Sequence, residues 1–173
     1  ISSTIQIWDL ENNKCLQNLN GHLKTISEFK WSPDGMNLAT VSSDWRVKIW
    51  DTESWECQQT LVGHSDGVSR ISWSPDGSKI ATGSGDGEII LWDTYSWRSI
   101  TKYKMYPYSN NYFNRYSIKY LEWSSDGEKI IVFVDDIIKI IDPNDWTVIS
   151  NYSHDSYKIM EVDYSPDSDM LAV

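Results

Sequence analysis

Serine, histidine and aspartate side chains occur together twice in this chain, and each set also contains a tryptophan. The two sets are His22, Ser42, Asp44 and Trp50, and, 42 positions later, His64, Ser84, Asp86 and Trp92. Ser, His and Asp form the triad of many hydrolases, in which Ser attacks the substrate and His takes its proton. A hydrolase needs its triad once, however, whereas this set recurs at a fixed step. The spacing therefore favours a structural role for both sets over catalysis.

Other groups of residues that suggest chemistry are weaker. The three His and two Cys residues do not follow the spacings of metal ligands, so neither a metal nor a cofactor is expected. The glycine-rich run 83–87 is similar in composition to a phosphate-binding loop, but a strand rather than a helix is expected after it. We interpret this run as a β-turn.

The segments that hold these side chains repeat with a period of 42 residues. The Trp-Asp pairs begin at Trp8, Trp50 and Trp92, and the Gly-His pairs begin at Gly21 and Gly63. The run Trp-Ser-Pro-Asp-Gly occurs at 31–35 and again at 73–77. A period of this length is typical of repeat architectures, in which each unit buries its apolar face against its neighbours.

Residues 63–104 form the clearest unit. The step from Val68 to Ile71 interrupts the alternation of apolar residues and predicts a bulge near the start of a first strand that ends at Trp73. Turn residues then separate three further predicted strands, at 80–84, 88–92 and 97–103. Four short antiparallel strands form a meander, and no segment has helical periodicity. We therefore predict an all-β protein.

The ordered markers Gly-His, Ser-Pro-Asp-Gly, Ser-x-Asp-Gly and Ile-x-x-Trp-Asp resemble the WD40 repeat over essentially the whole chain. The resemblance implies that each unit is one blade of a β-propeller and that its first strand lines a central channel. It also implies that each His, Ser, Asp and Trp set is a buried hydrogen-bonded tetrad. In this interpretation Asp fixes the imidazole tautomer, His donates to the Ser hydroxyl, and this hydroxyl bonds the indole N–H.

The chain as a whole, residues 1–173, is predicted to hold about four blade equivalents. The segments are the end of a preceding blade (1–20), two regular repeats (21–62 and 63–104), a degenerate repeat with a loop insertion (105–150) and the start of a further repeat (151–173). Members of this family mostly have about seven blades, so we expect these units to belong to a larger propeller. An open propeller would expose stacking faces and could self-associate.

Composition limits the partners. A net charge of −10 makes a nucleic acid or an anionic membrane an unfavourable partner. No apolar run reaches the length of about 20 residues that a membrane helix needs. Cys15 and Cys57 occupy the same position in adjacent units, which argues against a disulfide between them. Two free thiols are typical of a reducing compartment, so a cytoplasmic, intracellular location is expected.

Departures from the repeat point to function. Trp45 stands where the next unit has Gly87, at the tip of a turn, and about eight extra residues lie within 105–117. In the third unit Phe133 and Ile141 stand where Ser and Trp are expected, so its tetrad is lost. By the resemblance, Trp45 and the insertion lie on the same rim of the propeller.

The leading hypothesis is a non-enzymatic WD-repeat scaffold that binds a protein or peptide through this rim. Aromatic and Arg residues on an exposed surface are typical of binding hot spots. The candidate rim residues are Trp45, Ser43, Arg46, Lys24, Asp66, Tyr106, Tyr108, Tyr112, Phe113, Arg115 and Tyr116. For the insertion, binding and packing over its own blade remain open alternatives. The alternative function is an accessory or sensor propeller of a longer protein whose catalytic domain, such as an ATPase or kinase, lies outside this chain.

Overall fold

The computed structural model describes residues 2–105, 117–134, 137–153, 163–165 and 170–172. Within these residues the structure contains sixteen β-strands and no helix, which confirms the all-β prediction. The strands are β1 (Thr4–Asp9), β2 (Lys14–Asn20), β3 (Ile26–Trp31), β4 (Asn37–Ser42), β5 (Arg46–Asp51), β6 (Cys57–Val62), β7 (Val68–Trp73), β8 (Lys79–Ser84), β9 (Glu88–Asp93), β10 (Ser99–Lys104), β11 (Ile118–Trp123), β12 (Ile130–Val134), β13 (Ile137–Ile141), β14 (Val148–Ser153), β15 (Asp163–Tyr164) and β16 (Leu171–Ala172). No helix capable of crossing a membrane is found in the described part of the chain.

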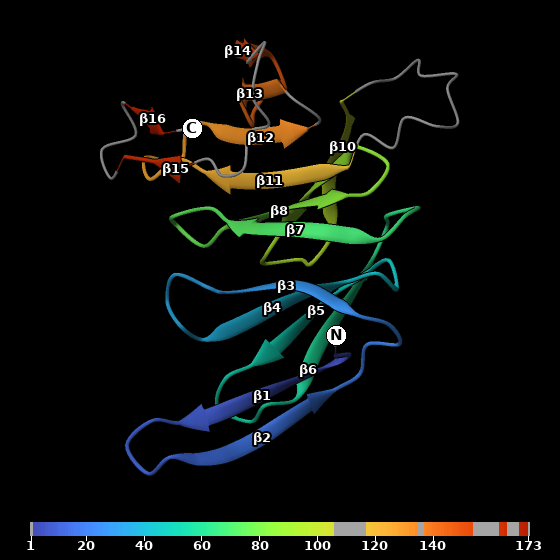
Figure 1. The fold of residues 1–173 in the computed structure, drawn as a ribbon, viewed down its shortest axis with the longest axis vertical. Helices are drawn as coiled ribbons and strands as arrows, with labels where there is room; N and C mark the ends of the chain where they lie inside the picture. The colour runs from blue at the N-terminus through green and yellow to red at the C-terminus, as the bar shows by residue number, and fades with distance from the viewer. Residues whose placement is uncertain (1, 106–116, 135–136, 154–162, 166–169, 173) are drawn as a thin grey trace.

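The strands form five antiparallel sheets that follow the order of the chain. Three sheets have four strands each (β3–β6, β7–β10 and β11–β14), and the pairs β1–β2 and β15–β16 form sheets of two strands. Figure 1 shows the sheets stacked along the long axis, with β3, β7 and β11 at the front. The four-stranded sheets have the meander order expected for WD40-type propeller blades, and the described residues do not close a ring. Membership in a larger ring stays a prediction. The expected boundary between residues 150 and 151 falls within β14, which continues to Ser153.

Local sequence accounts for the shape of each blade. The predicted bulge is confirmed, because the register between β7 and β8 shifts between Val68 and Arg70. In the turn after β7, Gly77 has a φ of 72°, a conformation that a glycine adopts without steric cost. The Ser74 hydroxyl donates to the Asp76 carboxylate at 2.6 Å and helps to hold this turn. These features send β7 and β8 in opposite directions with little intervening chain.

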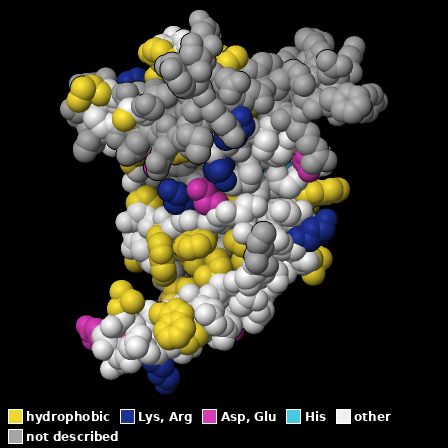
Figure 2. Space-filling view, viewed as in Figure 1, with side chains coloured by type: hydrophobic (Ala, Val, Ile, Leu, Met, Phe, Trp, Pro, Cys, Tyr) yellow, Lys and Arg dark blue, Asp and Glu magenta, His cyan; other side chains and the backbone are white. Residues whose placement is uncertain are grey.

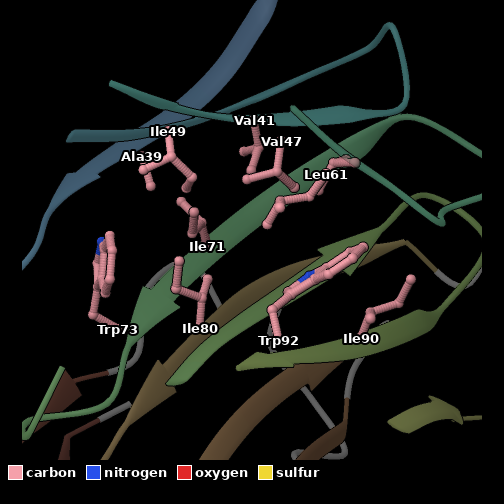
Figure 3. Close-up of a cluster of buried hydrophobic side chains, with 11 residues drawn as sticks. Ala39, Val41, Val47, Ile49, Leu61, Ile71, Trp73, Ile80, Ile90 and Trp92 are labelled. Atoms are coloured by element: carbon pink, nitrogen blue, oxygen red, sulfur yellow. The ribbon is translucent and has the colours of Figure 1, made fainter. Parts of the chain in front are cut away.

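One large buried cluster lies between the sheets β3–β6 and β7–β10, and another lies between β7–β10 and β11–β14. Figure 3 shows the first of these clusters, in which apolar side chains of β3–β6 face those of β7–β10. The buried side chains of this cluster are Ala39, Val41, Val47, Ile49, Leu61, Val68, Ile71, Trp73, Ile80, Ile90 and Trp92. Because all of this surface is buried only when two blades stack, each blade depends on its neighbour for stability.

The face of β3 is less covered than the equivalent face of β7. Trp31 is 49% exposed, whereas its counterpart Trp73 is 8% exposed and donates its indole N–H to the Lys30 carbonyl at 3.2 Å. The two-stranded sheet β1–β2 packs beside the sheet of β3, as Leu19 shows by its contact with Leu38 and Trp50. A two-stranded sheet covers less area than the four-stranded sheet that lies against β7. Figure 2 shows the resulting apolar surface over the β1 and β3 region.

Three tryptophans at equivalent positions of the four-stranded sheets lie in turns that precede the outer strands. Trp55, Trp97 and Trp146 have φ values of 59°, 57° and 64°, and each precedes its strand by two residues. The prediction that a strand begins at Trp97 is therefore wrong by two residues. The rings contribute to packing, since Trp55 meets Trp31 edge-on at 5.9 Å and Trp146 stacks on Tyr103 at 5.1 Å between ring centroids.

Candidate functional site

The first predicted tetrad forms, with one residue exchanged. His22 Nδ1 lies 2.9 Å from the Asp44 carboxylate, and His22 Nε2 lies 2.8 Å from the Thr40 hydroxyl. The indole N–H of Trp50 donates to the same hydroxyl at 3.0 Å. The chain of contacts thus joins the loop before β3 to β4 and β5. These contacts hold three segments of one blade together.

Thr40, and not Ser42, supplies the hydroxyl of this tetrad, which corrects the prediction. Trp50 pairs with Leu38 across the β4–β5 ladder, so its ring reaches the next position on the same face, Thr40. Ser42 lies two residues further along, at the end of β4. There its hydroxyl donates to the Lys24 carbonyl at 3.2 Å and accepts the Asp44 amide at 3.1 Å. Ser42 therefore holds the turn rather than the imidazole.

The protonation of the tetrad also differs from the prediction. Burial lowers the pKa of His22, despite the opposing hydrogen bond to Asp44, and the ring is neutral at pH 7. Because a carboxylate can only accept, the imidazole proton lies on Nδ1, and Nε2 must accept from Thr40. His22 therefore receives a hydrogen bond from the hydroxyl instead of donating one. Every donor in the series from Trp50 to Asp44 then meets an acceptor.

The Asp44 carboxylate has several donors. Burial alone acts to raise its pKa, but the Leu23 amide at 2.8 Å and the His22 ring outweigh this effect and lower the pKa of Asp44 below its ordinary value. The Arg46 amide donates to the second oxygen at 3.1 Å. Asp44 is thus ionised and fixed, as a structural clip requires.

The second set keeps only part of the tetrad. His64 Nε2 lies 2.7 Å from the Thr82 hydroxyl, and Trp92 donates to that hydroxyl at 2.8 Å. His64 Nδ1 instead faces Glu88, whose carboxylate oxygen lies 3.4 Å away. Both atoms are buried and make no hydrogen bond with the described residues. The prediction that Ser84 and Asp86 complete this tetrad is therefore wrong.

Asp86 forms its hydrogen bonds and ion pair with residues other than His64. Its carboxylate accepts the Ser84 hydroxyl at 2.5 Å and the Ser65 hydroxyl at 3.0 Å, and Lys104 Nζ lies 3.5 Å away. The first blade has Leu23 and Val62 at the positions of Ser65 and Lys104, so Asp44 has neither competitor. Burial acts to raise the pKa of Asp86, but the two hydroxyl donors outweigh it and the pKa lies below its ordinary value.

The third blade replaces the polar set by apolar packing. Ile118 pairs with Val134, as Val68 pairs with Ser84, so Val134 and not Phe133 occupies the Ser84 position. Ile141 pairs with Ile130 at the place of Trp92, as expected, and both are buried. Asp135 lies outside the described residues. The loss of the tetrad, expected from Ile141, leaves a blade held by aliphatic contacts.

These arrangements give no support to a catalytic triad. Ser84 donates to Asp86 rather than to His64, and the hydroxyls that do meet His22 and His64 belong to Thr40 and Thr82, which are fully buried. A nucleophile without access to solvent cannot reach a substrate. Among the described residues no cluster of His, Cys, Asp or Glu is able to hold a metal ion.

Trp45 is the most unusual residue at the rim of the first four-stranded blade. It has a φ of 72°, and its counterpart Gly87 has a φ of 76°. A left-handed conformation costs a residue with a side chain about 1–2 kcal/mol. The indole is 48% exposed and packs against none of the buried clusters, whereas the turn tryptophans Trp55, Trp97 and Trp146 each do. Strain at an exposed aromatic residue points to a function outside the fold.

The other predicted residues of this rim lie beside Trp45. The Lys24 carbonyl accepts a hydrogen bond from the Ser42 hydroxyl, and the Ser43 amide donates one to the Thr25 carbonyl at 2.9 Å. Arg46 directly follows Trp45 at the start of β5. The loop before the first strand and the turn between the second and third strands therefore share one edge, as the resemblance implied. Figure 1 shows β8 and β12 running toward this edge at the right.

Two apolar rim residues were missed by the sequence reasoning. Leu23 is 81% exposed and its amide donates to Asp44, while Val62 is 67% exposed and pairs with Arg46 across β5 and β6. A comparison of the two repeats could have revealed them, because the next unit has the polar residues Ser65 and Lys104 at the same positions. Apolar residues on an exposed edge, where a neighbouring unit is polar, mark a surface available for contact.

Asp66 lies on the adjoining rim of the next blade. Its carboxylate accepts the Gly67 amide at 2.7 Å. A side chain on Gly67 would lie 3.4 Å from the Ser43 Cα, so the two rims are in direct contact. The predicted residues Trp45, Ser43, Arg46, Lys24 and Asp66 are thus brought together along one edge.

The remaining predicted residues Tyr106, Tyr108, Tyr112, Phe113, Arg115 and Tyr116 lie outside the described residues. Met105, which precedes them, donates its amide to the Gly87 carbonyl at 3.1 Å. The described chain therefore reaches this segment from the same edge, beside the turn of the second blade.

Comparison with known proteins agrees with the repeat structure. The family model of the WD40 repeat, described as WD domain, G-beta repeat, matches residues 13–51 and 55–93. Coronin-7 of Homo sapiens is 47% identical over 45 residues, which cover 26% of this chain and 5% of that protein. Coronin-7 of Rattus norvegicus is 49% identical, and that of Mus musculus 44%, over the same extent. The similarity thus spans a small part of much longer relatives.

Proposed function

This chain carries WD40 repeats, which generally mediate protein interactions, and we propose that it is a non-enzymatic scaffold whose rim binds a protein or peptide. The rim is defined by Leu23, Lys24, Ser43, Trp45, Arg46, Val62 and Asp66. The observation that carries the proposal is the exposed Trp45 indole, held in a left-handed turn where the next blade has Gly87. An exposed aromatic ring on a rigid turn is a suitable hot spot, since little side-chain freedom is lost on binding.

The setting of Trp45 supports the proposal further. The turn that presents it is fixed from below by the tetrad, because Asp44 precedes Trp45 and accepts hydrogen bonds from His22, the Leu23 amide and the Arg46 amide. A side chain on such a support keeps its orientation before a partner arrives. The tetrads thus serve binding indirectly by holding the rim in place.

Free Cys15 and Cys57 fit a reducing location, and we propose that the scaffold acts in the cytoplasm.

A selection experiment tests the rim. A random peptide library displayed on phage is panned on the purified chain, and fluorescence anisotropy then measures the Kd of each selected peptide for Trp45→Gly. Tyr95→Gly is the matched control, because Tyr95 is exposed on a turn at the other end of the strands, where Thr94 bonds the Gly77 carbonyl. We expect Trp45→Gly, and not Tyr95→Gly, to weaken binding. Peptides that bind both variants as well as the parent chain would refute the rim assignment.

A further inference from the structure

The rims of the first two four-stranded blades carry opposite chemistry on the same backbone positions. At the five positions compared, the first blade has Leu23, Lys24, Trp45, Arg46 and Val62, and the second has Ser65, Asp66, Gly87, Glu88 and Lys104. Apolar or cationic side chains thus give way to polar or acidic ones at three of the five positions, and Trp45 gives way to Gly87, which has no side chain. At the fifth, Val62 gives way to Lys104, which pairs with Asp86.

The apolar residues Leu23, Trp45 and Val62 lie along the rim of the first blade, and we call this row the strip. Leu23 lies in the inner loop and its amide bonds Asp44, Trp45 follows Asp44, and Val62 pairs with Arg46 on the outermost strand. The strip therefore crosses the blade from its inner loop to its outer strand. All three side chains are about half or more exposed, so the strip is open to a partner.

Two cations, Lys24 and Arg46, lie beside this strip. None of the ion pairs found among the described residues includes Lys24 or Arg46. Two unpaired cations that flank an exposed indole provide a positive site on a negative protein.

From this charge pattern, and resting on the rim function proposed above, we propose that the partner is an acidic peptide. An apolar side chain of the peptide packs on the strip of Leu23, Trp45 and Val62, and its neighbouring carboxylates pair with Lys24 and Arg46. Asp66 on the rim of the next blade repels those carboxylates and confines them to the first blade. The two rims together therefore set both the place and the direction of the peptide.

A single-stranded nucleic acid fits this surface less well. Aromatic rings flanked by cations do bind stacked bases, but a nucleic acid carries a charge at every nucleotide. Its backbone would meet the acidic second rim, which contacts the first directly at Gly67 and Ser43. The net charge of −10 adds to the repulsion. A peptide with carboxylates at one end avoids the second rim, and it meets less repulsion from the net charge because it carries fewer charges than the nucleic acid.

The test uses four fluorescein-labelled probes and the whole chain. The first is a short peptide of glutamates and serines that contains one leucine. In the second lysines replace the glutamates, and in the third serine replaces the leucine. The fourth is an oligothymidine. Fluorescence anisotropy at low and at physiological salt gives each Kd, and we expect only the first peptide to bind, with an affinity that falls as salt rises.

Three variants locate the site. Trp45→Gly removes the ring and restores the residue of the next blade, and it should weaken binding of the first peptide by about thirtyfold or more, as for a hot spot. The double variant Lys24→Glu and Arg46→Glu should weaken it by about tenfold or more. The control double variant Lys14→Glu and Arg98→Glu makes the same change of charge at exposed positions outside the rim, near the other ends of the strands, and should leave Kd unchanged. Circular dichroism establishes that each variant is folded.

The outcomes separate the two proposals. If the leucine-lysine peptide binds and the acidic one does not, and Trp45→Gly abolishes that binding, the rim function stands and the acidic-peptide proposal is overturned. If the oligothymidine binds more tightly than the acidic peptide, or if no peptide binds, the acidic-peptide proposal is also overturned. If the acidic peptide binds equally to the parent and to both rim variants, the rim itself is refuted. An equal loss in the control double variant would show nonspecific attraction and overturn the acidic-peptide proposal.

Discussion

His64 Nδ1 lies 3.4 Å from the Glu88 carboxylate without forming a hydrogen bond, whereas His22 Nδ1 lies 2.9 Å from Asp44 and is hydrogen-bonded to it. The same histidine is thus tightly held in one blade and loosely held in the next. The cause is the diversion of Asp86 to Ser65, Ser84 and Lys104. Two repeats with the same markers therefore differ in how firmly their rims are supported.

The first prediction compares the two histidines. His22→Ala should lower the free energy of unfolding by about 2–3 kcal/mol, because it leaves Thr40 and one buried oxygen of Asp44 with fewer partners. His64→Ala should cost about 1–2 kcal/mol, because Nδ1 makes no hydrogen bond that could be lost. Urea denaturation followed by tryptophan fluorescence measures both. A larger loss for His64→Ala would contradict the observed difference.

The second prediction concerns the hydroxyl of the first tetrad. Thr40→Val keeps the shape of the side chain but leaves His22 Nε2 and the Trp50 indole unpaired, at an expected cost of about 2–4 kcal/mol. Thr40→Ser is the control and should recover most of that stability, since it keeps the hydroxyl. Ser42→Ala should cost less than Thr40→Val. If the order of these two variants were reversed in urea denaturation, Ser42 would be the tetrad residue after all.

The third prediction is a dependence on acid. Burial lowers the pKa of His22 in the folded chain, so the unfolded chain binds more protons as pH falls below the ordinary value of 6.5. Stability is therefore present above pH 6.5 and decreases as pH falls through that value. The pKa of Asp44 is lowered, and hydrogen bonds from Ser74 and Ser78 lower the pKa of Asp76 to about 2, so further stability is lost as pH falls below the ordinary value of 3.8.

The measurement is the urea midpoint between pH 4.5 and 7.5. His22→Gln removes the titrating group and should flatten the slope just below pH 6.5, while the decline at lower pH remains. An unchanged slope in His22→Gln would show that other groups cause it.

The fourth prediction separates binding from packing at Trp45. Trp45→Gly should leave the free energy of unfolding unchanged or raise it by up to about 1 kcal/mol, because the relief of left-handed strain offsets the loss of a ring that is half exposed. Gly87→Ala introduces the strain in the next blade and should cost about 1 kcal/mol. Thermal unfolding measures both variants. A marked loss of stability in Trp45→Gly would assign the ring to packing.

Much of the blade could be predicted from sequence. The 42-residue period, the Ser-Pro-Asp-Gly turns and the step from Val68 to Ile71 determined the strands and their bulge, since these depend on neighbours along the chain. The hydroxyl of the tetrad could not be predicted by spacing alone. Thr40 and Ser42 lie on the same face of β4, and only the pairing of Leu38 with Trp50 decides which one the indole reaches.

The rim was harder to predict than the blade. The diversion of Asp86 requires Ser65 and Lys104 from two different segments to meet it, and their positions follow only from the folded sheet. Leu23 and Val62 looked like ordinary apolar residues in a strand-rich chain. Their importance depends on exposure, which the alternation of residues does not report at the ends of strands.

The fifth prediction follows from the unequal cover of β3 and β7. Trp73 is buried and donates its indole N–H to Lys30, so Trp73→Ala should cost about 3–5 kcal/mol through the cavity and the lost hydrogen bond. Trp31 is half exposed and keeps mainly its edge-on contact with Trp55, so Trp31→Ala should cost about 1 kcal/mol. Urea denaturation at low protein concentration measures the two. If Trp31→Ala proved as costly as Trp73→Ala, and this cost stayed the same on further dilution, the face of β3 would be covered within a single chain. If its cost instead decreased on dilution, that face would be buried between associated copies.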